Sequence, residues 1–394
     1  MTVLDRAFAA GLAVGLIFLV AIGAVGLPPL ASRGDFAEQW SAARLILEGG
    51  QPYDSGTWQA SAARLAGRAS DSPVFIYPPY VALALVPVAA IPLAAAATLW
   101  VTAGVLLAAF AIRWLLRSYP PPHPAIAAFI GLTLAASGPS LLALAQGQWG
   151  FFHIASAVAA AAAQRRGRAA TTAVSLVPFF LKPQLAPFVV LAFARAQAGA
   201  RRWRYLAVVG VAALVILATI VVVPTWWVDW YRGIVAFTAT HPLRTTTLAT
   251  TFEALFGAAG ALAAAAAVIV AVAIALVFEP RSDVALAVWL ATAVLVAPYI
   301  QAYDHVLLLV PLVIAVGVAA RRSQRTAFAI AAIGVPVLLI AATASDALTI
   351  ARGHDVVGAL VPAVMWLLVV VGLWPDRRLT ASRGATVAPE SGDQ

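Results

Sequence analysis

Long apolar runs restrict this chain more than any other feature of its sequence. A helix that crosses a lipid bilayer needs about 20 consecutive apolar residues. The candidate spans are 7–30, 93–116, 125–145, 149–164, 169–182, 184–197, 205–223, 254–278, 283–299, 305–320, 326–343 and 356–374. Several are short, so we expect some to tilt, to break or to line a cavity. The sequence therefore predicts an all-α polytopic membrane protein with about 12 transmembrane helices.

The composition excludes a water-soluble fold. Of the 394 residues, 63% are hydrophobic and only 10% are charged, whereas a soluble domain carries about 25% charged residues. The chain has no cysteine, which excludes disulfides and thiolate metal sites, and its five His residues are dispersed. We therefore expect no metal site and no other cofactor.

The net charge of +9 indicates a membrane rather than a nucleic acid as partner. Arg165, Arg166 and Arg168 lie in a short gap between apolar runs. That pattern is typical of cytoplasmic loops under the positive-inside rule. Arginines in such loops would meet anionic lipid headgroups.

The arginines also orient the predicted helices. With the N-terminus in the cytoplasm, all the basic loops fall inside: Arg113/Arg117, Arg165–Arg168, Arg195–Arg204, Arg321–Arg325 and Arg377/Arg378. This orientation requires segment 77–91, with its several prolines, to be a re-entrant or interfacial helix. If 77–91 crossed the membrane, Arg165–Arg168 would lie outside. Segments 31–76 and 224–253 are then predicted to lie on the far side of the membrane, and both termini in the cytoplasm.

We predict one transmembrane domain over residues 1–375 and a disordered cytoplasmic tail over 376–394, which is polar. The first apolar run has no small-residue cleavage site followed by a soluble body, so it is expected to be a retained helix. No internal repeat is evident, which weakens an inverted-repeat transporter without excluding it.

Asp35 is the first candidate for chemistry, because it follows the first predicted helix by only a few residues. A carboxylate held half out of water near the membrane surface has a proton affinity tuned by burial and by its neighbours. The alternative is that Asp35 only caps a helix running to Leu47, since Asp is a preferred cap residue. Arg44 and Glu48, four residues apart on that helix, can form an ion pair on a solvated face.

Lys182 is the only lysine of the chain and lies between two short apolar runs. Lysines near helix ends often extend to the membrane interface and do nothing more. An ionisable residue between two half-helices is also a candidate functional group, and an ammonium suits a phosphate.

Further polar groups fall at predicted outer turns. Gln146-Gly147-Gln148 offers hydrogen-bonding groups for a sugar or for a neighbouring helix, and Tyr303-Asp304-His305 suits proton transfer, phosphate binding or a helix cap. His241 and Arg244 are candidate anion ligands. Asp229 lies among Trp226, Trp227, Trp230 and Tyr231, a cluster that we interpret as an interfacial aromatic belt. The chain contains no nucleotide-binding glycine loop, which argues against a soluble nucleotide donor or an ATP-driven pump.

Several short motifs together resemble glycosyltransferase family 87. In chain order they are Gly34-Asp35-Phe36, Ala43-Arg44-Leu45, Leu47-Glu48-Gly49, Gln51-Pro52-Tyr53-Asp54, Tyr77-Pro78-Pro79, Gly147-Gln148, Leu181-Lys182-Pro183-Gln184 and Asp304-His305. The resemblance covers roughly residues 33–310. This family belongs to the C-type membrane glycosyltransferases and includes polyprenyl-phosphate-mannose-dependent mannosyltransferases of mycobacterial cell envelopes.

The resemblance implies a C-type helical bundle with a juxtamembrane or re-entrant helix after the first outer loop. It implies a hexosyltransferase, with mannose as the expected sugar, that moves the sugar from a polyprenyl-phosphate donor to an envelope lipid or glycan. The site would face the periplasm of a bacterial inner membrane. Asp35 would be the general base of an inverting reaction. The stretch after Asp54 matches no motif, so the acceptor stays open.

The chemistry of a glycosyl transfer suggests a role for each candidate residue. An acceptor hydroxyl needs a base as it attacks, and a leaving phosphate needs cations or donors nearby. Expected phosphate ligands are Lys182, His241, Arg244 and His305, and expected sugar or acceptor ligands are Glu38, Arg44, Tyr53, Tyr77, Gln148, Gln184 and Asp304. The main alternative is a flippase or transporter for lipid-linked sugars, in which the same charges line a path. A non-catalytic envelope assembly protein is a third possibility.

Overall fold

The computed structural model describes residues 1–23, 32, 34–67, 70, 72–197, 199–222, 225–240, 246–257, 259–278, 283–344 and 358–374. Most of these residues are helical, and none of them is in a strand. The predicted ligands His241 and Arg244 and the predicted tail lie outside the described residues.

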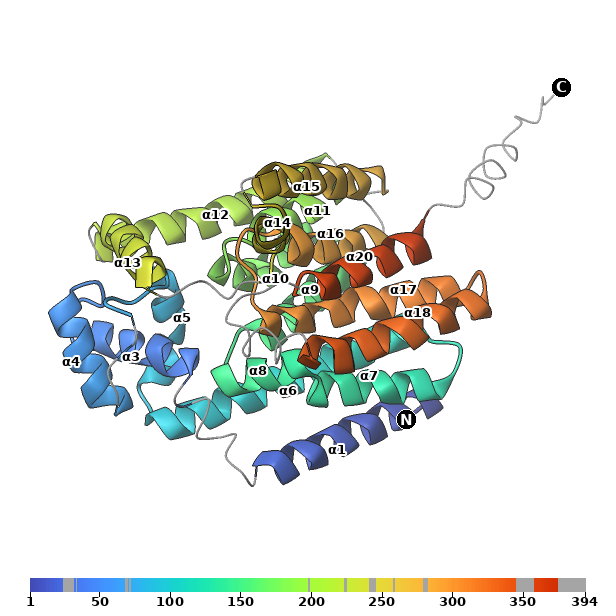
Figure 1. Ribbon diagram of the computed structural model, residues 1–394, viewed down its shortest axis with the longest axis horizontal. Coiled ribbons are helices and arrows are strands. Elements are labelled where there is room, and N and C mark those ends of the chain that lie inside the picture. Colours follow the sequence, from blue (N-terminus) through green and yellow to red (C-terminus); the bar gives the residue numbers. More distant parts are fainter. Residues whose placement is uncertain are drawn as a thin grey trace, which may run out of the picture.

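Figure 1 shows how the helices of the described residues are arranged. They are α1 (Val3–Gly23), α3 (Asp35–Leu47), α4 (Ser55–Ala66), α5 (Pro79–Ala89), α6 (Leu93–Ser118), α7 (Pro124–Ala136), α8 (Gly138–Gln146), α9 (Gly150–Arg165), α10 (Ala169–Ser175), η1 (Val177–Leu181), α11 (Ala186–Ala196), α12 (Ala200–Val222), α13 (Trp226–Thr240), α14 (Leu248–Phe256), α15 (Ala259–Val277), α16 (Asp283–Val296), η2 (Ala302–Leu308), α17 (Leu309–Ala320), α18 (Gln324–Pro336), η3 (Val337–Ala341) and α20 (Leu360–Leu373).

Seven helical segments of the described chain are long and apolar enough to cross a membrane: Val3–Ala21, Leu93–Ser118, Pro124–Gln146, Ala200–Thr219, Ala259–Val277, Ala302–Ala320 and Gln324–Ala344. Each coincides with a predicted span. The predicted spans 169–182, 184–197, 283–299 and 356–374 correspond to shorter apolar helices, and 149–164 corresponds to α9. The multi-pass helical architecture is therefore confirmed, whereas the number of 12 full spans is not.

Segment 77–91 forms the short helix that its prolines predict. α5 has 11 residues and contains Pro87, so it rises by roughly 16 Å, about half of the thickness of a bilayer core. It packs against α3, which in turn packs against α4. These three helices lie together at the left-hand end in Figure 1.

α17 lies at the centre of the bundle. Nearly all of its side chains are buried, because it packs against α6, α16, α18 and α20. Most side chains of α12 and α15 are exposed although they are apolar, as expected for helices that face lipid tails. The buried centre thus holds the outer elements in place.

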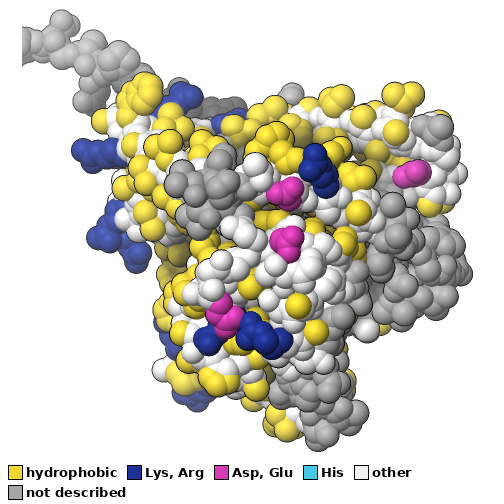
Figure 2. All heavy atoms as spheres, turned by 90° about the vertical axis from the view of Figure 1, so that its left-hand side faces the viewer, with side chains coloured by type: hydrophobic (Ala, Val, Ile, Leu, Met, Phe, Trp, Pro, Cys, Tyr) yellow, Lys and Arg dark blue, Asp and Glu magenta, His cyan; other side chains and the backbone are white. Residues whose placement is uncertain are grey.

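Charged side chains lie at both ends of the bundle. Near the start of α1, the buried Asp5 carboxylate accepts hydrogen bonds from Arg113 and Arg117 of α6, at N–O distances of 2.7 to 2.9 Å. Figure 1 shows that α20 ends at the same end of the molecule as α1 begins. Figure 2 shows the opposite end, where Asp and Glu side chains lie at the surface together with Lys or Arg side chains.

Candidate functional site

A cavity of about 350 Å³ lies where five distant parts of the chain meet. Its wall is formed by Ile76, Tyr77, Pro78, Gln148, Trp149, Leu181, Lys182, Pro183, Gln184, Trp230, Ile234, Phe237, Tyr299 and Tyr303. Hydroxyl, amide and ammonium groups therefore share one hollow with several aromatic and aliphatic side chains. This mixture suits a ligand with a polar head and an apolar tail.

Close backbone packing brings Asp35 to this cavity. The start of α3 lies against the end of α8, so that a Cβ at Gly34 would come within 2.8 Å of Gln146 Cα. Gly147 ends α8 in the left-handed region, at φ +65°, and a Cβ there would lie 2.4 Å from Phe36 Cβ. The Asp35 N–H donates to Gln146 Oε1 at 3.2 Å. Gly34 and Gly147 therefore allow the two helices to come this close.

The Asp35 carboxylate points toward the cavity wall. Its Oδ2 accepts a hydrogen bond from the Tyr77 hydroxyl at 2.9 Å and another from the Gln148 amide. The predicted helix over 35–47 is confirmed, but Gly34 is its N-cap and Asp35 is its first helical residue. Two donors on one oxygen stabilise the ionised carboxylate.

Tyr77 is fixed by its own neighbours. Its carbonyl accepts a 2.5 Å hydrogen bond from the hydroxyl of the buried Tyr53. Burial, and next the negative charge of Asp35, raise the pKa of the Tyr77 phenol well above its usual value. Tyr77 is therefore a neutral donor at any physiological pH. Tyr53, predicted as a sugar ligand, holds the backbone of Tyr77 and is not part of the cavity wall.

Gln148 connects the carboxylate to the cavity. Its side chain is only 2% exposed, and its amide nitrogen donates to Asp35. Its carbonyl oxygen has no hydrogen-bond partner among the residues that the structure describes. Buried polar atoms are nearly always satisfied, so this oxygen is an unfilled hydrogen-bonding position beside the cavity.

Lys182 lies at the tip of a re-entrant pair of short segments. α10 and η1 lead to it, and α11 leads away. After α11, the Gln197 amide donates to Gln164 near the end of α9, so the chain returns to the end of the bundle that it left. Residues 169–182 and 184–197 are thus two short arms that run in opposite directions, each shorter than the about 20 residues of a full span.

The ammonium of Lys182 is buried and paired. It forms an ion pair with Asp304 and lies 4.5 Å from the centre of the Tyr303 ring. The other carboxylate oxygen of Asp304 accepts the Gln301 N–H at 3.2 Å and so caps η2. Lys182 and Tyr303 line the cavity, whereas Asp304 lies behind them.

The remaining predicted ligands differ in whether they reach the cavity wall. Gln184 lines the cavity. Glu38, one turn after Asp35, accepts a 2.8 Å hydrogen bond from Ser70. Arg44 contacts Glu48 and the Ala89 carbonyl and takes no part in the cavity wall, and the buried His305 contacts Thr246 at 3.1 Å without reaching that wall.

Two tyrosines and three residues of α13 line the cavity although the sequence did not assign them to the site. Tyr299 and Tyr303 line the cavity. α13 contributes Trp230, Ile234 and Phe237, a spacing that places them on one helix face. The aromatic-belt interpretation fits the exposed neighbours Trp227 and Tyr231, but not Trp230, whose indole donates to the Ile76 carbonyl at 2.7 Å.

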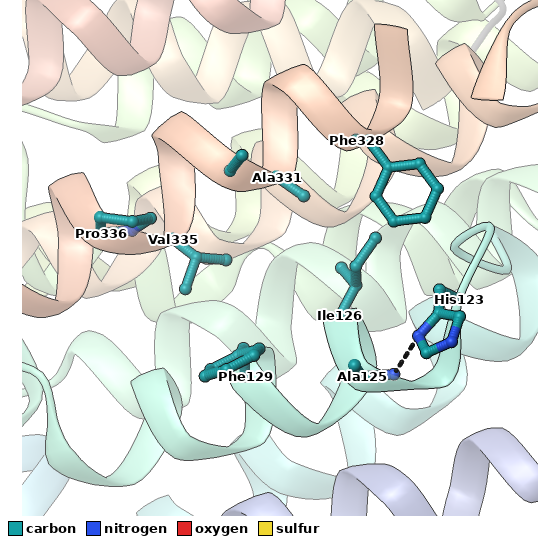
Figure 3. A pocket seen from close by; sticks show the side chains of 9 residues that line it. His123, Ala125, Ile126, Phe129, Phe328, Ala331, Val335 and Pro336 are labelled. Carbon is teal, nitrogen blue, oxygen red and sulfur yellow. Dashed lines mark hydrogen bonds between the residues drawn. The ribbon is translucent and has the colours of Figure 1, made fainter. Parts of the chain in front are cut away.

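A second hollow has a different character. It holds about 290 Å³ between α7 and α18 and is lined by His123, Ala125, Ile126, Phe129, Phe328, Ala331, Ala332, Val335 and Pro336 (Figure 3). Its one titratable side chain, His123, uses Nδ1 to accept the Ala125 N–H at 3.2 Å. Carboxylates and ammonium groups are absent from this wall, so the first cavity is the candidate active site.

Metal ligands do not gather in the part of the chain that the structure describes. No group of three or more His, Asp or Glu side chains lies close enough to hold an ion there. The expectation of no metal and no cofactor stays a prediction.

Comparison with protein families assigns the chain. The family model of glycosyltransferase family 87 matches residues 75–298. The chain belongs to glycosyltransferase family 87. No curated protein and no solved structure matches it significantly. The matched region of this family 87 member includes Tyr77, Gln148 and Lys182, whereas Asp35 and Asp304 lie outside it. A family 87 protein with membrane-spanning helices is a membrane glycosyltransferase, and it uses a sugar donor and an acceptor.

Proposed function

We propose that this membrane glycosyltransferase moves a hexose, with mannose as the expected sugar, from a polyprenyl-phosphate donor to a hydroxyl of an envelope lipid or glycan. One observation carries the proposal. A carboxylate, Asp35, is hydrogen-bonded to two side chains of a cavity whose wall also presents the ammonium of Lys182. These are the base and the cation that such a transfer needs at its two ends.

The proposed reaction is a single displacement with inversion. The acceptor oxygen attacks the anomeric carbon and forms the new glycosidic bond. The bond between that carbon and the phosphate oxygen breaks, and the phosphate leaves with the electron pair. The hydroxyl proton passes to Asp35, since an alcohol becomes an effective nucleophile only as a base removes its proton. Tyr77 and Gln148 hold the carboxylate in place.

The leaving phosphate is assigned to Lys182. Charge that develops on a leaving group is stabilised best by donors that are already in position, and Lys182 is fixed by Asp304 and by the Tyr303 ring. The neutral phenols of Tyr299 and Tyr303 and the amide of Gln184 line the same cavity. They are suited to hydrogen bonds with the sugar or with phosphate oxygens.

The polyprenyl chain is assigned to the α13 side of the cavity. Trp230, Ile234 and Phe237 provide apolar surface there, together with Ile76 and Leu181. Such a surface matches the apolar character of isoprene units, which stay out of water. The donor would thus keep its tail among apolar side chains while its phosphate reaches Lys182. We place this site on the periplasmic side of a bacterial inner membrane, because the basic loops belong in the cytoplasm.

The substitution Asp35→Asn tests the proposal. Asparagine keeps the size of the side chain, but an amide cannot take the acceptor proton. We expect transfer of labelled hexose from polyprenyl phosphate in nanodiscs to fall by about 10²–10⁴-fold, while donor binding and the unfolding temperature change little.

Asp54→Asn is the matched control. Asp54 caps α4 by accepting the Thr57 N–H at 2.8 Å, and Asn is an equally good cap, so transfer should be unchanged. A stable Asp35→Asn protein with near-normal transfer would contradict the assignment of the base. A wild-type protein that transfers nothing but moves lipid-linked hexose across vesicles would be a flippase.

A further inference from the structure

Asp304 takes no direct part in the proposed reaction, yet it is the closest charge to the cation that does. It is fully buried, with one carboxylate oxygen on Lys182 and the other on the Gln301 N–H. Held from both sides, the carboxylate cannot turn away from the ammonium. The Lys182 side chain is 8% exposed and lines the cavity, whereas Asp304 does not. A phosphate in the cavity would therefore contact Lys182. The negative charge of Asp304 would repel it from a greater distance.

This arrangement matters because the lipid phosphate changes charge during the reaction. In the donor it is a diester with one negative charge. After the sugar has left it is a monoester, which carries about −1.5 to −2 at pH 7. A fixed negative charge repels the monoester about twice as strongly as the diester, since the energy is proportional to the product of the charges. Lys182 without a counterion would attract the spent lipid more strongly than the donor.

We propose that Asp304 is a built-in counterion that weakens the hold of Lys182 on the spent polyprenyl phosphate and so promotes its release. The inference rests on the proposed function. Asp304 is a positioning residue, because it acts through Lys182 and touches no reacting atom. With Asp304 in place, the ion pair is neutral as a whole. The ammonium can still donate hydrogen bonds to the donor phosphate, but the site does not become a trap for a doubly charged product.

The substitution Asp304→Asn tests this proposal. Asparagine can still accept the Gln301 N–H, so the cap of η2 is kept while the charge is lost. The probes are polyprenyl phosphate and its methyl ester, which stays singly charged, titrated at pH 8 against the protein in nanodiscs without acceptor. We expect the variant to bind the monoester about tenfold tighter, with a smaller gain for the methyl ester. Pre-steady-state transfer should show a first turnover followed by a slower steady rate.

Asp229→Asn is the control for loss of a carboxylate from the same predicted side. Asp229 lies on α13 near Arg232 and is part of neither the cavity wall nor the Lys182 pair, so both probes should bind as to wild type. Unchanged or weaker binding of the monoester by Asp304→Asn would overturn the proposal, since a merely structural role can only loosen the site.

The preference for the monoester over the methyl ester provides a second measurement. At pH 8 this preference should be smaller in the wild type than in Asp304→Asn, and an equal or larger preference in the wild type would also overturn the proposal. Both binding experiments are independent of transfer. Absence of transfer by the wild type would therefore reject the proposed function and leave the question of the counterion to these titrations.

Discussion

Lys182 combines a structural role with the proposed chemical one, and the two can be separated. The substitution Lys182→Gln should weaken donor binding by about 1.5–3 kcal/mol, the range for hydrogen bonds to charged groups. It also leaves Asp304 buried without a cation, and breaking a buried ion pair costs about 3–5 kcal/mol of stability. Lys182→Arg should be partly tolerated, because the charge survives while the shape changes. Titration of donor analogues and thermal unfolding measure the two effects.

The double variant Lys182→Gln/Asp304→Asn separates these effects. It removes both charges of the buried pair, so stability should return toward that of the wild type while donor binding stays weak. If Lys182→Gln alone binds and uses the donor normally, Lys182 is a structural residue only.

Tyr77 gives a prediction about pH. The pKa of its phenol is raised well above 10 in the folded protein, first by burial and then by Asp35. Its donor form is therefore complete below the unfolded pKa and is lost only as the pH rises through the higher folded value. Tyr77→Phe should lower the transfer rate, because one donor to a carboxylate is lost. The ratio of wild-type to variant rates should stay constant from pH 6 to about 10, and a decline toward one within that range would contradict the assignment.

At the level of elements, the contact between α3 and α8 should be intolerant of a single methyl group. Gly147→Ala combines a left-handed backbone, which costs an L-residue about 1–2 kcal/mol, with a clash against Phe36. Gly49→Ala is the matched control, since Gly49 has φ +78° and nothing within 4 Å of a Cβ. The control should lose only the stability that the strained left-handed backbone costs, and it should keep its transfer activity.

Gly147→Ala should lose more stability and more activity than the control, because Phe36 is next to Asp35. Thermal unfolding and hexose transfer are the measurements. Equal losses in the two variants would show that the close approach of α3 to α8 has no importance for the site.

For the whole molecule, the orientation in the membrane remains a prediction. The chain contains no cysteine, so single cysteines can report it. Ser55→Cys, on the exposed first turn of α4, should react with an impermeant reagent added outside. Gln324→Cys, exposed at the start of α18, should react only after the membrane is opened. The opposite pattern would invert the proposed topology and place the cavity on the cytoplasmic side.

The sequence predicted the local features of this fold better than the meeting of its parts. The length of the apolar runs predicted the long helices, and the prolines of segment 77–91 predicted the short helix α5. The motifs around Asp35, Gln148 and Lys182 were each recognised, and the structure brings Gln148 to Asp35 and both Gln148 and Lys182 to one cavity. The ion pair between Lys182 and Asp304 and the cavity face of α13 depend on tertiary packing. Periodicity and composition carry no information about such contacts.

The pairing of Lys182 with Asp304 has a consequence for how the protein is made. The two residues are 122 positions apart, and a ribosome adds about 5–20 residues per second. Lys182 therefore waits roughly 6 to 24 s for its partner to be synthesised. An unpaired ammonium is costly in a bilayer, so during that interval residues 169–196 should stay in contact with water or with the insertion machinery. The loop can settle in the membrane only after the segment around Asp304 has emerged.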